Sequence, residues 1–89
     1  MARFVCEEKL GVRSISKARE EVMKLFESGE DLSLDMSALR RIDMSVGQFI
    51  VAVQKEGKLR GVQVRIAGIT PGVRHQLSLC GVVKWGGNA

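Results

Sequence analysis

The chain has 89 residues, of which 45% are hydrophobic and 27% charged, and its net charge at pH 7 is +4. This length predicts a single domain over residues 1–89, with a core over residues 3–85 and a frayed tail over residues 86–89. The composition is globular and excludes intrinsic disorder. The longest apolar run, Phe49 to Val53, is far shorter than the roughly 20 residues that cross a bilayer, so no membrane insertion is expected.

The composition also argues against nucleic acid, metal and cofactor binding. Basic residues are scattered from Arg3 to Lys84, and the aromatic residues, with no tyrosine among them, offer no stacking platform for bases. The chain has one histidine, and its two cysteines, Cys6 and Cys80, form no CxxC pair. Because no secretory signal begins the sequence, we expect a cytoplasmic protein with reduced thiols.

The first third of the chain predicts a strand, a helix and a second strand. The first strand is expected over Arg3–Cys6. In the following helix, Ser14 or Ser16 caps the start and Gly29 ends it. The apolar face of this helix consists of Ala18, Val22, Leu25 and Phe26. Apolar and polar residues then alternate over Leu32–Met36, which is typical of a strand with one buried face.

The stretch Arg40–Val53 predicts the start of a second helix. Asp43 stands where an N-cap belongs. The helix is expected to run to Glu56, with Gly57 as its stop signal. Four apolar residues at helical spacing form its buried stripe: Val46, Phe49, Ile50 and Val53.

The last third of the chain predicts a strand, a helix and a final strand. The alternating residues 61–68 form a strand whose buried face consists of Val62, Val64 and Ile66. Thr70 caps a third helix that begins at Pro71 and closes at Gly81. The apolar face of that helix consists of Val73, Leu77 and Cys80. A weak last strand covers residues 82–85.

This order of elements predicts an α/β fold. We expect a small, mostly parallel sheet of four strands with three helices stacked on one face, because right-handed crossovers between neighbouring strands place all helices on the same side. A parallel strand buried on both faces would be apolar throughout. The alternation in the two middle strands therefore leaves the other face of the sheet open to water or to a partner.

Side chains suited to catalysis are scarce, and we expect a protein that is not an enzyme. His75 falls in the third helix beside an arginine, where a surface position explains it. The sequence contains no nucleophile elbow and no phosphate-binding glycine loop. Asp35 and Asp43 stand at the ends of adjacent elements, and a strand end and a helix cap explain them better than an acid–base pair does.

Ser45 is the residue whose role this pattern leaves open. It falls in the first turn of the second helix and, with Gln48, Ala52 and Lys55, lies away from the buried stripe. A phosphate on Ser45 would gain from free backbone N–H groups and from the positive end of the helix dipole, and it could block a partner without disturbing the fold. Serine is also common in the first turn of helices, so both explanations stand.

From about Ser14 to Val83 the sequence resembles a STAS domain, the family of anti-sigma factor antagonists and of the cytoplasmic domains of sulphate transporters. Members of this family typically have a strand ending in Asp-Leu-Ser, then Asp-Ser-Ser-Gly at the start of a helix, a glycine-containing turn, a further strand and a short helix containing proline. The matching stretches are LDMSALRRID, QKEGKLRGVQVRIAG, TPGVRHQLSL and CGV. The resemblance implies a short bacterial single-domain form that acts in signal transduction and transcription regulation.

In the family, a serine kinase that is itself the anti-sigma factor phosphorylates the second serine of Asp-Ser-Ser-Gly. In this chain Asp43 takes the acidic position, Met44 the first serine and Ser45 the second, while Val46 replaces the glycine. The resemblance thus implies a phosphoprotein with its phosphorylation site at Ser45. The surface that it implies for the protein partner consists of Arg41, Asp43, Met44, Ser45, Val46 and Gln48.

The resemblance also allows a second function. Some family members carry no phosphorylatable residue and act as scaffold subunits of membrane-associated lipid transporters of the ABC type. The partner and the pathway stay open. The roles of Arg40 and Arg41 are open too: they stabilise a phosphate, help a kinase to dock, or are solvated. Because family members usually begin with two strands and this chain has room for one, its exposed edge favours a partner or a homodimer.

Overall fold

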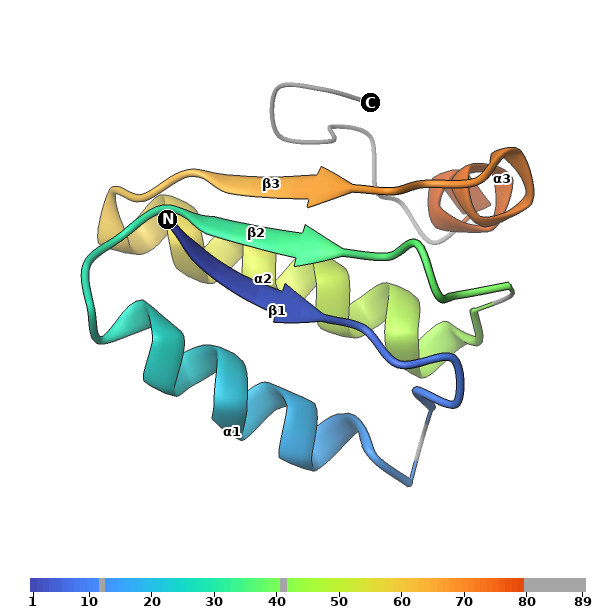
Figure 1. Cartoon of the computed structure of the whole chain (residues 1–89), viewed down its shortest axis with the longest axis horizontal. Helices are drawn as coiled ribbons and strands as arrows, with labels where there is room; N and C mark the ends of the chain where they lie inside the picture. The colour runs from blue at the N-terminus through green and yellow to red at the C-terminus, as the bar shows by residue number, and fades with distance from the viewer. Residues whose placement is uncertain (12, 41, 80–89) are drawn as a thin grey trace.

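The computed structural model describes residues 1–11, 13–40 and 42–79 (Figure 1). In these residues, strands and helices alternate along the chain. They are β1 (Ala2–Val5), α1 (Ile15–Phe26), β2 (Leu32–Asp35), α2 (Met44–Arg60), β3 (Val64–Ala67) and α3 (Pro71–Leu79). The predicted α/β class is confirmed. The fourth predicted strand, residues 82–85, lies outside the described residues, as do Cys80 and Gly81 at the predicted end of the third helix.

The sheet has the parallel, sequential order that the sequence predicts. β1 pairs with β2 and β2 with β3, both in parallel, and Phe4, Leu34 and Ile66 share one row of the register. α1 and α2 pack together on one face, α1 against β1 and α2 against β3 (Figure 1). α3 lies beyond the carboxyl end of β3 (Figure 1). Two of the three helices thus cover the sheet as predicted, while the third lies at its carboxyl edge.

The core lies between the sheet and the helices. Most residues of the predicted apolar faces are buried: Ala18, Val22, Phe26, Leu32, Leu34, Val46, Phe49, Ile50, Val53, Val64, Ile66, Val73 and Leu77. Leu25 and Val62, predicted to belong to these faces, are half-buried. The rings of Phe4 and Phe49 meet edge to face, with centroids 6.3 Å apart, and join β1 to α2.

The end of α2 differs from the prediction. Gly57, the predicted stop, lies buried inside the helix, where a Cβ atom would stand 2.5 Å from Cγ2 of Val64. The helix continues to Arg60 and ends at Gly61, whose φ of 73° is left-handed. Gly57 therefore allows α2 to approach β3 closely, and Gly61 makes the turn.

The start of α1 also differs from the prediction. Ser14 occupies the N-cap position, but its hydroxyl makes no capping hydrogen bond; it accepts instead from the Gly11 N–H at 3.2 Å. The cap of α3 is confirmed, because Oγ1 of Thr70 accepts from the Val73 N–H at 3.3 Å.

Candidate functional site

The loop between β2 and α2 leaves the carboxyl end of the central strand, the edge at which open α/β sheets commonly form their sites. Three of its side chains, Met36, Leu39 and Ile42, are buried in the core. The Ile42 N–H also donates to Oε1 of Gln76 in α3, at 2.6 Å. Anchored in this way from the core and from α3, the loop fixes the position at which α2 begins.

Asp43 organises the first turn of α2. Its Oδ1 accepts two hydrogen bonds, one from the Val46 N–H at 2.9 Å and one from the Ser45 hydroxyl at 2.6 Å. The predicted N-cap is thus confirmed. The bond from Ser45, followed by that from Val46, holds the pKa of Asp43 below its ordinary value, because both donors favour the ionised carboxylate.

The structure divides the partner surface that the sequence predicts. Asp43, Met44 and Gln48 are exposed, and Met44 is an apolar residue of which 61% is accessible. Ser45 is half-buried. The sequence-based placement of Val46 on the contact surface is not matched by its position: Val46 is fully buried, because it belongs to the stripe that packs on the sheet.

Of the two arginines before the site, only Arg40 lies within the described residues, and Arg41 lies outside them. Nε of Arg40 lies 3.6 Å from Oε1 of Glu8, and both side chains are largely exposed. Such an exposed ion pair contributes little to stability.

A second carboxylate, Asp35, ends β2. Its Oδ1 accepts from the backbone N–H and the hydroxyl of Ser37, at 2.9 and 2.7 Å, and its Oδ2 pairs with the guanidinium of Arg3. The bonds from Ser37, then that from Arg3, lower the pKa of Asp35 to about 2. Asp35 and Asp43 therefore have separate partners and lowered pKa values, the opposite of the raised pKa that a general acid needs at neutral pH.

Comparison with known proteins places this fold and loop in a family. The family model of the STAS domain matches residues 4–86. The chain belongs to the STAS domain family. No curated protein sequence matches this STAS domain significantly.

Two solved structures resemble this STAS domain closely. RsbS from Moorella thermoacetica, in a variant with one serine replaced by glutamate, has a TM-score of 0.82 at 26% identity, covering 91% of this chain and 70% of that one. A structure described as the molecular architecture of the stressosome, a signal integration and transduction hub, has a TM-score of 0.77 at 27% identity, covering 90% and 71% of the two chains. The STAS domain described here is therefore similar to regulatory signalling modules.

Two further reactive side chains, Cys6 and His75, fall among the described residues. Cys6 is fully buried; this burial, then the charge of Asp35, raises the pKa of its thiol to about 12, so it stays protonated at neutral pH. His75 is exposed on α3, as predicted. In the described ranges, no three metal-binding side chains gather, and no helix has the length and apolar content to span a membrane.

Sequence reasoning missed the cluster of Arg3, Asp35 and Ser37. The alternation in the strands was a usable signal, since it places Arg3 and Asp35 on the same face of the sheet. Their contact joins residues 32 apart in the chain, and only the parallel register of β1 and β2 brings them together.

Proposed function

We propose that this STAS domain is a non-enzymatic regulatory module whose binding to a protein partner is switched by phosphorylation of Ser45. The partner is a serine kinase or anti-sigma factor, and it contacts residues 39–43 and the start of α2. The observation that carries the proposal is the double hydrogen bond on Oδ1 of Asp43, from the Ser45 hydroxyl and the Val46 N–H. The switch residue thereby belongs to the cap of the helix.

Phosphorylation changes this cap in a defined way. The γ-phosphoryl group of ATP is transferred to Oγ of Ser45, the hydroxyl proton leaves, and ADP departs. Oγ can then no longer donate to Asp43. The phosphate adds a charge of about −1.5 to −2 beside a carboxylate that is already ionised, so the two anions repel each other.

The expected result is a local change with the fold preserved. The side chains of Val46 and Phe49, which anchor the first turns of α2, are fully buried, so we expect their packing to persist when Ser45 is phosphorylated. Met44 and Gln48 are exposed on the surface to which phosphorylation of Ser45 would add the phosphate. An apolar residue with an accessible side chain, such as Met44, is a suitable anchor for a partner. A dianion beside this anchor opposes desolvation and binding.

The similarity to RsbS and to the stressosome supports a role in regulated protein assembly. A second candidate function rests on Met44 and Val46, which stand where the family motif has a serine and a glycine. These replacements favour a phosphorylation-independent scaffold subunit of a lipid transporter of the ABC type. Such a scaffold would bind an ATPase subunit without any phosphate on Ser45.

Charge substitution at Ser45 tests the proposal. Serine kinases and ATPase subunits encoded beside the gene are purified, and their affinities are measured for the wild type, Ser45→Glu and Ser45→Ala. Ser16→Glu is the matched control, because Ser16 is an exposed serine in the first turn of α1. We expect Ser45→Glu to weaken kinase binding about tenfold or more, with the two other variants near wild type.

The outcomes separate the two functions. Tight binding of an ATPase subunit that Ser45→Glu leaves unchanged would support the scaffold. Equal losses of affinity for Ser45→Glu and Ser16→Glu would mean that a negative charge weakens binding wherever it is added, and the proposed switch would be wrong.

A further inference from the structure

The face of the sheet opposite to α1 and α2 carries a row of three polar side chains. Arg3 of β1, Ser33 of β2 and Arg65 of β3 are partners in the parallel register. Burial alternates along each strand, so these side chains share the face turned away from the core, with both arginines exposed and Ser33 half-buried. Because neighbouring strands lie about 4.8 Å apart, the backbone positions of the two arginines lie on either side of Ser33.

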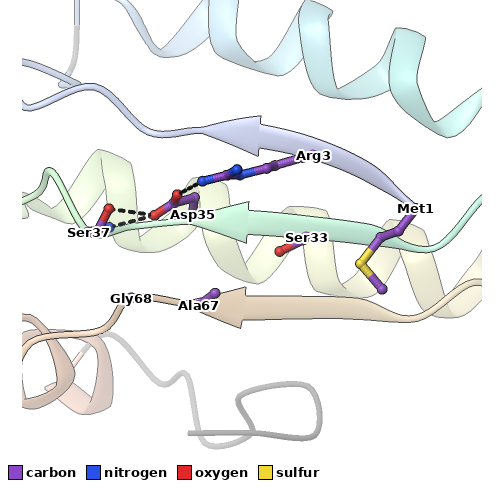
Figure 2. A pocket seen from close by; sticks show the side chains of 7 residues that line it. All are labelled: Met1, Arg3, Ser33, Asp35, Ser37, Ala67 and Gly68. Atoms are coloured by element: carbon purple, nitrogen blue, oxygen red, sulfur yellow. Dashed lines mark hydrogen bonds and ion pairs between the residues drawn. The ribbon is translucent and has the colours of Figure 1, made fainter.

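The donors of this row are available to a ligand. Asp35 holds Arg3 from one side, as Figure 2 shows, yet 64% of the Arg3 side chain stays exposed. Within the part of the chain that the structure describes, neither the guanidinium of Arg65 nor the hydroxyl of Ser33 has a hydrogen-bonding or ion-pair partner. The row therefore presents two cations, and Asp35, the carboxylate beside Arg3, is already paired with it.

A shallow hollow of about 510 Å³ lies beside the row (Figure 2). Small residues, Ser33, Ala67 and Gly68, line it together with Met1, Arg3 and Asp35. The close approach of two strand ends shapes its carboxyl end, since a Cβ atom on Gly68 would stand 2.8 Å from the backbone nitrogen of Ser37. Met1 and Val5, 61% and 50% exposed, add apolar surface.

We infer that this surface, Arg3, Ser33 and Arg65 with the adjoining hollow (the open face), binds an acidic segment of a partner protein. Aspartate or glutamate carboxylates of the segment pair with Arg3 and Arg65 and accept from the Ser33 hydroxyl. An apolar side chain of the segment lies in the hollow against Met1 and Ala67. Charge complementarity selects acidic residues, and the adjoining apolar surface favours a peptide over a free anion.

The open face is separate from the proposed switch, because it lies on the other side of the sheet from α2 and its first turn (Figure 1). Ser45 takes no part in it. A module with two such surfaces holds one partner at the open face while phosphorylation controls another at the start of α2.

An acidic peptide probes this inference directly. The ¹⁵N-labelled chain is titrated by NMR with an acetylated hexapeptide of four glutamates and two leucines, and in parallel with the same peptide carrying lysine for glutamate. We expect the acidic peptide alone to shift the amide signals of β1, β2 and β3. The signals of residues 43–48 are expected to stay unchanged, and Ser45→Glu is expected to bind the peptide as the wild type does.

Matched charge reversals locate the site. Arg65→Glu is expected to weaken peptide binding about fivefold, near the upper limit for an exposed ion pair. Arg13→Glu, the same change at an exposed arginine before α1, is expected to weaken it less than about twofold. Arg65 is exposed and unpaired among the described residues, so its variant should fold; Arg65→Gln is the milder second variant, and thermal unfolding checks both.

Two results would overturn the inference. Equal losses for Arg65→Glu and Arg13→Glu, or shifts spread over all basic residues, would mean that the net charge of +4 alone attracts the peptide. A concentration-dependent dimer that Arg65→Glu abolishes, without peptide binding, would mean that a second copy of the chain covers the open face.

Discussion

The Ser45 hydroxyl donates a 2.6 Å hydrogen bond to Oδ1 of Asp43, the oxygen that also caps α2 through the Val46 N–H. The candidate phosphoacceptor and the helix cap therefore share one atom. A modification of the Ser45 hydroxyl therefore changes a hydrogen bond of Asp43, the residue that caps the start of α2.

Replacing Ser45 with aspartate is expected to change the free energy of unfolding by less than about 1 kcal/mol. The variant lacks the hydrogen bond that the Ser45 hydroxyl donates to Asp43, and its new carboxylate is repelled by the Asp43 carboxylate. The helix dipole attracts the new carboxylate, and these opposing effects are similar in size. Denaturant unfolding measures the change, with Ser45→Ala as the control that removes the hydrogen bond alone. A loss above about 2 kcal/mol would assign Ser45 a mainly structural role.

Replacing Asp43 with alanine is expected to lower the free energy of unfolding by about 1 kcal/mol, because the Val46 N–H and the Ser45 hydroxyl lose their acceptor. Asp43→Asn keeps an acceptor oxygen and should retain most of the stability. Denaturant unfolding compares the two variants. If asparagine cost as much as alanine, the negative charge and not the capping hydrogen bond would be the stabilising feature.

Gly57→Ala is expected to destabilise the fold by about 1–3 kcal/mol, because the added methyl group would overlap Val64 and push α2 away from β3. Gly72→Ala is the matched control. Gly72 is also a helical glycine, but apart from its chain neighbours and its own helix backbone no atom of the described residues lies within 4 Å of where its Cβ would stand. Alanine there should therefore be neutral or stabilise by up to about 1 kcal/mol. Thermal unfolding of both variants checks the contrast, and an unchanged Gly57→Ala protein would contradict the close packing.

Acid is expected to destabilise the fold through Asp35 and Asp43. The pKa of Asp35 falls from its ordinary 3.8 to about 2 in the folded state, and that of Asp43 is also lowered. Because the folded state binds these protons less readily, the stabilisation is complete above about pH 5 and is lost as the pH falls through the folded pKa values. Unfolding measured from pH 6 to pH 2 should show this loss, and Asp35→Asn should reduce its steepness. An equally steep loss in Asp35→Asn would assign it to other groups.

Local spacing explains why the helices and the core could be predicted. The positions of Val46, Phe49, Ile50 and Val53 fix their common face, whatever the rest of the chain does. The end of α2 could not be predicted, because the reason for a glycine at 57 is the nearness of Val64 in another element. The sequence shows that residue 57 has no side chain, but it does not show which neighbouring element packs into that space.

The candidate site shows the same division. The N-cap role of Asp43 was predictable because its bond to the Val46 N–H spans three residues. At Val46 two sequence arguments disagreed: the helical projection buried it, whereas motif matching placed it on the partner surface. The structure agrees with the projection, since periodicity reports the physical environment of a residue and motif position reports only its order. The Arg3–Asp35 pair depends on strand register and could not be deduced from local spacing.

Mapping the phosphorylation site tests the proposed switch most directly. The chain and its Ser45→Ala and Ser37→Ala variants are incubated with ATP and each serine kinase encoded beside the gene, and the products are analysed by peptide mass spectrometry. Ser37 is the matched control, because it is an exposed serine in the same loop whose hydroxyl also bonds an aspartate. The proposed function predicts a single phosphate on Ser45 in the wild type and in Ser37→Ala, and none in Ser45→Ala. A phosphate on Ser37 or another residue, or none with any of these kinases, would contradict it.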